Sequence, residues 1–283
     1  MPMVKRLFLF AGYDKNGIID DALIYYMEQL HKFGDVILCM DSDCKKTETD
    51  KVKRYCIHVI ATRHGEYDFG SYKRAYIFAQ DNHILNDYDI VYLLNDSVFG
   101  PTINLYNTLQ RAESGETNAT GLVVSKHRTH KFMESWFIKL DKKIFTAAWF
   151  NKFITSVKHE KNKADITVKY EHGLSNLILS NHLSWGGIYV IWGRYTYNHP
   201  KQLFNQGCPF IKRASFTRHN GAIGGQIKYI LEHCDKRAKN AILQTAYRIY
   251  GTEYMNWLLT ENPFKIFLRK VKYAAHKIFG GRK

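Results

Sequence analysis

Short apolar runs alternate with amphipathic stretches along the N-terminal third of the chain. The runs have the length of buried strands, which are expected at Arg6–Ala11, Val36–Met40, Tyr55–Ala61 and Ile90–Leu94. Apolar residues at helical spacing predict helices over Asp20–Phe33 and Gly70–Gln80. A strand that is apolar throughout is covered on both faces, so this alternation predicts a doubly wound α/β domain with a mainly parallel central sheet.

The rest of the chain continues the mixture with more helix. We predict helices over Phe132–Leu140, Phe145–Ser156 and Glu171–Asn181, a charged loop over Lys158–Lys163, a strand at Ile188–Trp192 and a mostly helical segment over Gln226–Leu259. No internal repeat or low-complexity linker interrupts the sequence. We therefore expect one domain over residues 1–262, followed by a C-terminal helix over residues 263–283.

Composition and charge narrow the classes of function. The 283 residues are 45% hydrophobic, enough for a sizeable core, and the formal net charge is +15. Such a charge attracts nucleic acid, anionic lipid or phosphorylated small molecules. No helix-turn-helix, RNP or zinc-finger pattern appears, so no nucleic-acid partner is expected. The five cysteines are odd in number and lack CxxC spacing, which favours a reduced, cytoplasmic compartment. No apolar stretch approaches the length of a spanning helix, so we expect a soluble or peripheral protein.

Polar residues follow the predicted strand at Ile90–Leu94. Asn95, Asp96 and Ser97 come directly after it, and Gly100-Pro101 then turns the chain. Ligands of open α/β sheets bind beyond the carboxyl ends of the strands. A carboxylate at that edge can hold a divalent cation or a sugar hydroxyl, whereas the alternative is a simple Asx turn.

A second polar segment follows the predicted strand at Tyr55–Ala61. Asp68 is placed to cap the next helix, Gly70 allows a ligand to approach the backbone, and Lys73 with Arg74 can meet phosphate charge. The alternative is a capped surface helix with solvated basic residues. The literal Asp-x-Asp sequence at Asp41-Ser42-Asp43 follows the second strand, and we interpret it as a polar strand end.

Blocks of residues from both segments, and others further along the chain, resemble the rhamnan synthesis protein F family of bacterial glycosyltransferases. They are Tyr67-Asp68-Phe69-Gly70-Ser71-Tyr72-Lys73; Tyr88-Asp89 with Asn95-Asp96-Ser97-x-Phe99-Gly100-Pro101; His130 with Ser135-Trp136-Phe137 and Lys169-Tyr170-Glu171-x-Gly173-Leu174-Ser175; and Gly207-Cys208-Pro209-Phe210-Ile211-Lys212. The Asn-Asp-Ser-x-Phe-Gly-Pro block is the specific one, and the others support it.

The resemblance implies a GT-A-like nucleotide-sugar transferase. In that family a sugar, rhamnose, passes from an activated nucleotide donor such as dTDP-rhamnose to a cell-surface polysaccharide or lipid-linked acceptor. The donor-binding residues implied are Asp68, Gly70, Lys73, Asn95, Asp96 and Ser97. Asn95-Asp96-Ser97 takes the place of the family's metal-binding Asp-x-Asp motif. Only Asp96 is acidic there, so Mg²⁺ or Mn²⁺ held by Asp96 and neutralisation by Lys73 or Arg74 both stay open.

The resemblance also suggests a general base. An inverting transfer needs one carboxylate to take the proton of the acceptor hydroxyl, and in GT-A enzymes this acid commonly opens a helix late in the domain. Glu171 stands at such a predicted helix start, with Asp165 as the reserve candidate. The alternative for Glu171 is an acid that only stabilises the first turn through the helix dipole.

The C-terminal segment predicts a basic amphipathic helix. Apolar Phe264, Phe267, Leu268, Val271, Ala275 and Ile278 share one face, and the basic residues include Lys265, Arg269, Lys270, Lys272 and Lys277. With no acidic residue in this segment, an anionic membrane surface is the expected partner, on the inner face of the cell membrane. The alternative is a helix packed on the domain with a solvated basic face.

Two other classes of function stay open. A non-catalytic carbohydrate-binding homologue fits the motif with a single acid, and a basic nucleic-acid-binding protein fits the charge.

Overall fold

The computed structural model describes residues 4–218 and 222–279, and the chain divides into two compact units. The first unit contains Met1–Asp96 and Leu109–Gly193, and the second contains Ser97–Thr108 and Arg194–Lys283. Residues 1–262 were expected to form one domain, and no Gly- or Pro-rich linker marks Asp96 or Gly193, where the chain passes between the units.

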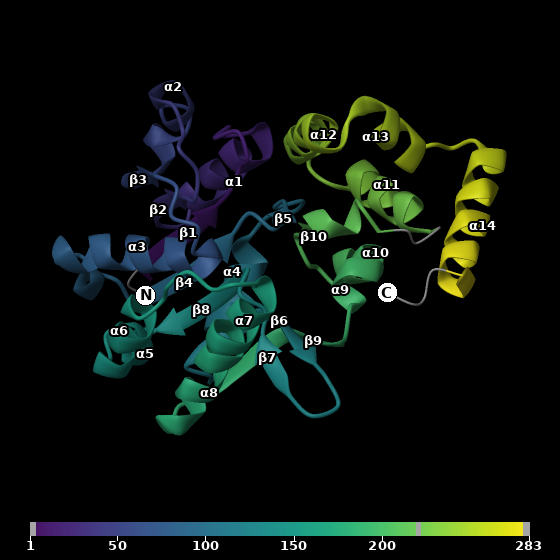
Figure 1. The fold of residues 1–283 in the computed structure, drawn as a ribbon. Coiled ribbons are helices and arrows are strands. Elements are labelled where there is room, and N and C mark those ends of the chain that lie inside the picture. The colour runs from purple at the N-terminus through teal and green to yellow at the C-terminus, as the bar shows by residue number, and fades with distance from the viewer. Residues whose placement is uncertain (1–3, 219–221, 280–283) are drawn as a thin grey trace. The chain divides into compact units, whose positions relative to one another are not determined.

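The first unit is built on an eight-stranded sheet (Figure 1). Its strands are β1 (Arg6–Gly12), β2 (Asp35–Met40), β3 (His58–Ala61), β4 (Ile90–Asn95), β6 (Ala119–Lys126), β7 (Lys131–Met133), β8 (Phe137–Asp141) and β9 (Trp185–Trp192). Their order is β3-β2-β1-β4-β8-β6-β7, with β9 paired to β6. Strands β3, β2, β1 and β4 are parallel, β8 is antiparallel to β4 and β6, and β9 is parallel to β6. The predicted α/β class with a mainly parallel central sheet is confirmed.

Helices cover both faces of this sheet. They are α1 (Asp21–His31), α2 (Lys46–Thr49), α3 (Tyr67–Asp81), α4 (Tyr106–Glu113, whose first residues belong to the second unit), α5 (Lys142–Phe145), α6 (Ala148–Thr155), α7 (Lys163–Ile166) and α8 (Gly173–Ser180), with 3-10 turns η1 (Lys53–Tyr55) and η2 (Leu85–Asp87). Phe10 of β1 packs edge-on against Tyr26 of α1, at 5.0 Å between ring centroids. Its neighbour Leu9 belongs to the core that contains Phe69 and Tyr72 of α3. Successive residues of β1 thus meet opposite helical layers, which explains why the strand is apolar throughout.

One predicted helix is wrong. Phe132–Leu140 forms the two strands β7 and β8, joined by a turn through Glu134, Ser135 and Trp136. The apolar residues of this segment have helical spacing. In the structure, however, β7 pairs with β6, and β8 pairs with both β4 and β6. Pairing with these distant strands therefore decides the local structure. The partner strand β6 was not predicted from the sequence.

The second unit is mostly helical, as predicted for Gln226–Leu259. It contains α9 (Tyr195–Asn198), α10 (Pro200–Asn205), α11 (Ile223–His233), α12 (Lys236–Tyr250), α13 (Thr252–Leu258) and α14 (Pro263–Phe279), the 3-10 turn η4 (Arg213–Ser215), and a short antiparallel pair of β5 (Val98–Phe99) with β10 (Ile211–Lys212). Asn262 accepts a hydrogen bond from the backbone N–H of Lys265 at 3.1 Å, and Pro263 follows it as the first helical residue of α14. No helix in the described part of the chain is both long and apolar enough to cross a bilayer.

Candidate active site

The loops that follow β1 and β4 are tied together at Asp96. Its backbone N–H donates to the carbonyl of Ala11 at 3.1 Å, and its carboxylate accepts from the N–H of Tyr13 at 3.1 Å. Asn95, the last residue of β4, is buried and donates from Nδ2 to Asp68 at 2.9 Å. The structure therefore brings Asp68 and Asn95, which the sequence placed in two separate polar segments, to one edge of the sheet.

Helix α3 begins three residues earlier than predicted, which changes the place of Asp68. The helix starts at Tyr67, so Asp68 lies in its first turn and is not the capping residue. Gly70 is buried, and a Cβ there would lie 2.2 Å from the Cβ of Glu66. Glu66 thus occupies the space beside Gly70 that the sequence interpretation gave to a ligand.

Glu66 also binds the two cations that the sequence offered for a diphosphate. Its carboxylate lies 2.5 Å from Nζ of Lys73 and 2.8 Å from Nη1 of Arg74. Burial opposes ionisation of Glu66, but hydrogen bonds from Arg74 and Lys73 outweigh it and lower the pKa of this carboxyl. Lys73 donates to the carbonyl of Val157 as well, at 2.6 Å. Both cations therefore hold the segment before α3 in place.

The Asp-x-Asp sequence after β2 organises the loop that follows β3. Asp41 accepts from the backbone N–H groups of His64 and Gly65 at 2.7 and 2.8 Å, and Asp43 accepts from that of Arg63 at 2.9 Å. Among the residues that the structure describes, no three His, Cys, Asp or Glu side chains gather to hold a metal ion. In this structure Asp41 and Asp43 therefore hold the backbone of the loop that follows β3.

His64 in this loop is a neutral imidazole. Burial, together with the nearby charge of Arg74, lowers its pKa to about 4. The N–H of Glu66 donates to Nδ1 at 3.0 Å, so Nε2 carries the proton and donates to the hydroxyl of Ser71, also at 3.0 Å. Although Nδ1 lies 3.6 Å from the carboxylate of Asp41, the two do not form an ion pair at neutral pH, because the ring is uncharged.

Glu171 lies inside a continuous helical run and not at a helix start. The run passes from α7 through a π-helical segment, η3 (Thr167–His172), into α8. The carboxylate of Glu171 accepts a hydrogen bond from the hydroxyl of Ser135 at 2.6 Å. The reserve candidate, Asp165, lies near the beginning of the run and accepts from the side chain of Asn162 at 3.0 Å.

Tyr72 connects Glu171 to the end of β4. Its buried hydroxyl donates to the carbonyl of Ser135 at 2.9 Å. Burial raises the pKa of Tyr72 well above its usual value, the charges of Asp68 and Glu171 add to the rise, and a hydrogen bond with Asn95 opposes it. Asp68, Tyr72, Asn95, Ser135 and Glu171 form one connected polar group, which we call the strand-end cluster.

Glu134 is an acid that the sequence analysis missed. It is buried, and its carboxylate oxygens accept from the hydroxyl of Ser125 and from Nε1 of Trp136, both at 2.6 Å. These bonds fix the turn that carries Ser135. The sequence contained one signal for this acid, because Glu134 is a charged residue between the apolar Met133 and Trp136.

Ser97 belongs to the second unit, where it contacts the basic residues Lys212 and Arg213. Lys212, buried, donates from Nζ to the Ser97 hydroxyl at 3.2 Å, and the N–H of Arg213 donates to the Ser97 carbonyl at 2.9 Å. The guanidinium of Arg218 stacks 4.8 Å from the ring centroid of Tyr197, which Lys212 also approaches at 5.8 Å. From the sequence, Lys212 was only the last residue of a family block, and neither Arg213 nor Arg218 was predicted to belong to the site.

Helix α14 differs from the predicted basic helix at one residue. Arg269 is buried and donates to the carbonyls of Trp257 and Leu258, so it is not part of an exposed basic face. Lys265 and Lys270 are exposed as expected, and the side chains of Lys272 and Lys277 lie outside the described residues. The apolar side chains Phe264, Phe267, Leu268 and Val271 are 67%, 60%, 48% and 47% exposed.

A polar cluster beyond the parallel strands of an α/β sheet is the usual position of a ligand-binding site in this fold class. The model of the rhamnan synthesis protein F family matches residues 36–278, so the chain belongs to this family. The predicted resemblance is confirmed, and membership supports a glycosyltransferase. No curated protein sequence matches the chain.

Several solved structures resemble the chain weakly. A candidate nucleotide-diphospho-sugar transferase of Desulfovibrio desulfuricans G20 is 15% identical, with 88% of this chain and 99% of that chain covered and a TM-score of 0.42. The glycosyltransferase GlyE of Streptococcus pneumoniae TIGR4 is 15% identical over 72% and 50% of the two chains, with a TM-score of 0.39. Core-mannan synthase A of Aspergillus fumigatus, in its Mn/GDP form, is 10% identical over 56% and 66%, with a TM-score of 0.35. Likeness at this level assigns no activity.

Proposed function

We propose that this protein transfers a sugar, rhamnose, from a nucleotide diphosphate donor to a growing polysaccharide or lipid-linked acceptor. The observation that carries the proposal is the strand-end cluster, in which Glu171 is joined through Ser135 and Tyr72 to Asp68 and Asn95. Family membership supports the same conclusion, and rhamnose is the sugar that the family name indicates.

The proposed reaction is a single displacement with inversion. The carboxylate of Glu171 takes the proton from an acceptor hydroxyl, whose oxygen forms the new bond to the anomeric carbon as the bond from that carbon to the donor phosphate breaks. The nucleoside diphosphate leaves with the bonding electrons. The hydrogen bond from Ser135 holds the carboxylate in one orientation, and Tyr72 fixes the carbonyl of Ser135.

Donor binding is assigned to polar residues of the first unit. We assign contacts with the nucleotide sugar to Asp68, Asn95 and Asp96. Because Glu66 binds Lys73, we assign Lys73 to support of the site, together with Gly70.

A divalent cation, Mg²⁺ or Mn²⁺, is part of the proposal. Mg²⁺ is commonly held by one or two carboxylates together with phosphate oxygens and water, so Asp96 fits as a single protein ligand whose partners arrive with the donor. The ion would neutralise the charge of the leaving diphosphate. Membrane attachment is proposed through α14, whose exposed apolar face carries Phe264 and Phe267 and whose flanks carry Lys265 and Lys270.

Thermal unfolding in the presence of dTDP-rhamnose, UDP-sugars and GDP-sugars tests the proposal. At a concentration one hundred times Kd, the correct donor should stabilise the fold by about 2.7 kcal/mol. That corresponds to a rise of about 5–10 °C in the unfolding midpoint, by the usual proportion for domains of about this size.

Asp96→Asn is the matched variant for this test. An amide oxygen can still accept from the N–H of Tyr13, so the loop should keep its structure while the negative charge is lost. We expect stabilisation by donor with Mg²⁺ or Mn²⁺ to fall to the level seen with a chelator, and transfer to be lost. Full transfer by this variant would remove Asp96 from the site, and a panel without any stabilising nucleotide sugar would overturn the proposed function.

A further inference from the structure

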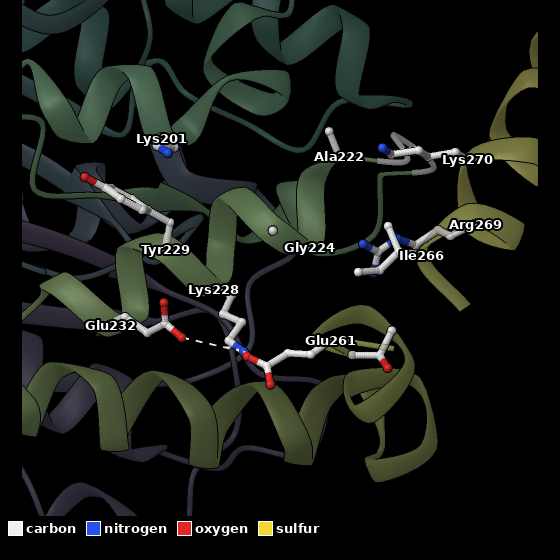
Figure 2. Close-up of a pocket in the computed structure, with 12 residues that line it drawn as sticks. Lys201, Ala222, Gly224, Lys228, Tyr229, Glu232, Glu261, Ile266, Arg269 and Lys270 are labelled. Carbon is white, nitrogen blue, oxygen red and sulfur yellow. Dashed lines mark ion pairs between the residues drawn. The ribbon is translucent and has the colours of Figure 1, made fainter. Parts of the chain in front are cut away.

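The second unit contains a cavity of about 570 Å³ that the proposed transfer reaction does not use. Figure 2 shows its lining, which comes mainly from α11 and α14. The charged residues of the lining are Lys201, Lys228, Arg269 and Lys270, with the carboxylates Glu232 and Glu261. Positive side chains therefore outnumber negative ones by two.

The two carboxylates lie beside the same lysine. Lys228 forms an ion pair with Glu261 and lies 3.6 Å from Glu232. In the part of the chain that the structure describes, no carboxylate forms an ion pair with Lys201 or Lys270. The excess positive charge of the cavity is therefore carried at the ends where these two lysines lie.

An aromatic ring holds one of these two lysines. Nζ of Lys201 lies 3.8 Å from the ring centroid of Tyr229, and the ring does not cancel the charge because it is not an acid. Arg269 donates to the carbonyls of Trp257 and Leu258. A dianionic group entering the cavity would balance the two positive charges that the lining leaves over.

Helix α14 joins this cavity to an apolar surface. Ile266, Arg269 and Lys270 line the cavity, whereas Phe267 and Leu268, from the same two turns, are exposed. One face of the helix thus borders a basic cavity, and another presents apolar side chains to solvent. A lipid has the same two parts, an anionic headgroup and an apolar chain.

We propose that the cavity binds a phosphate or diphosphate group, and that the group is the headgroup of an anionic lipid in the surface on which α14 lies. The proposal rests on the membrane attachment given above. A soluble phosphate compound carries the same compact dianion as a lipid headgroup, so the test must separate these two sources.

Gly225→Glu is the variant that tests the cavity. Gly225 belongs to the lining, and a Cβ added there would meet no atom within 4 Å. The position is in the first turn of α11, where a glutamate also suits the helix dipole, so the variant should fold. A carboxylate in the cavity should weaken binding of a dianion on the order of tenfold. Lys236→Gln is the control: Lys236 is an exposed residue of α12 outside the lining, and the variant changes the net charge by the same amount.

The lipid arm uses vesicles of phosphatidylcholine mixed with phosphatidic acid, or with phosphatidylglycerol at matched surface charge. We expect the full-length protein to prefer phosphatidic acid, which exposes a terminal phosphate. Gly225→Glu should lose this preference, and Lys236→Gln should keep it. Phe264→Ser with Phe267→Ser should weaken binding to both vesicles, because that change removes the apolar contact and leaves the cavity intact.

The soluble arm measures binding of inorganic pyrophosphate by calorimetry, with the full-length protein and with its Gly225→Glu and Lys236→Gln variants. Pyrophosphate binding that Gly225→Glu weakens, without any preference among vesicles, would support the phosphate site and overturn the lipid source. If Gly225→Glu changes neither vesicle preference nor pyrophosphate binding, the cavity is not a phosphate site. None of these measurements involves sugar transfer, so their outcome is independent of the donor assignment.

Discussion

Replacement of Glu171 by glutamine tests the chemistry most directly, because it removes a charge and keeps a hydrogen bond. The side-chain oxygen of glutamine can still accept from the hydroxyl of Ser135, as the carboxylate does at 2.6 Å. A general base contributes about 10²–10⁴-fold to the rate. That factor corresponds to about 3–5.5 kcal/mol of transition-state stabilisation, which glutamine cannot supply at neutral pH.

The structural cost of the same change is much smaller. A hydrogen bond to a charged acceptor contributes about 1.5–3 kcal/mol, and one to a neutral acceptor about 0.5–1.5 kcal/mol. The difference of about 1 kcal/mol lowers the unfolding midpoint by about 2–4 °C in a domain of about this size. Glu171→Gln should therefore lose transfer by at least about a hundredfold while staying folded at assay temperature.

The assay measures kcat for transfer, together with the thermal shift that the donor causes. We expect kcat to fall and the donor-induced shift to stay at its wild-type value, since Glu171 is assigned to the acceptor hydroxyl. Ser135→Ala is the companion variant: it keeps the carboxylate and loses its orienting hydrogen bond, so kcat should fall by less. Transfer by Glu171→Gln within about tenfold of wild type would refute the assignment, and Asp165→Asn would then be the variant to measure.

Two further predictions concern stability. Burial lowers the pKa of His64 in the folded state to about 4, below its usual value of about 6.5. Between these two pH values the unfolded chain therefore binds a proton at His64 and the folded chain does not. Stability should fall as the pH drops from about 6.5 towards 4, and the drop should be smaller in His64→Gln; equal pH profiles would show that His64 is not responsible. In α11, Gly224→Ala should destabilise the fold by about 1–3 kcal/mol, because its Cβ would lie 2.0 Å from the carbonyl oxygen of Leu258. Gly225→Ala should instead stabilise it by up to about 1 kcal/mol, and equal unfolding midpoints for the two variants would contradict the packing around Gly224.

The central parallel strands β1, β2 and β4 could be predicted from the sequence because each is short, apolar and covered on both faces. The segment after Ala119 could not, since β6, β7 and β8 are defined by pairing with one another and with β4, and local spacing does not record such pairings. The division into two units was also hidden. It depends on which residues pack together, and the chain passes between the units at Asp96 without a change in composition.

Of the candidate site, the sequence indicated individual residues and not their partners. Asp68, Asn95 and Glu171 were all named, but the connection through Tyr72 and Ser135 depends on β8 and η3 lying beside β4 and α3. From the sequence, Lys73 was assigned to phosphate. Its acid partner in the structure is Glu66, which lies seven residues earlier on the loop before α3, and sequence spacing alone does not indicate that contact.

The π-helical segment η3 sets the residue spacing in this part of the chain. Ile166, Tyr170 and Leu174 follow one another at intervals of four residues, and all three are buried in the same core. In a regular α-helix that interval drifts by about 40° at each step, whereas the wider π turn keeps the three side chains close to one face. The direction of the Glu171 side chain thus depends on how many residues separate the two buried anchors, Ile166 and Leu174, as well as on which residues these are. A deletion of one residue between Ile166 and Leu174 would return the segment to an α-helical repeat and turn Glu171 relative to one of the two anchors, which should weaken its contact with Ser135. Length variation should therefore not be tolerated in η3.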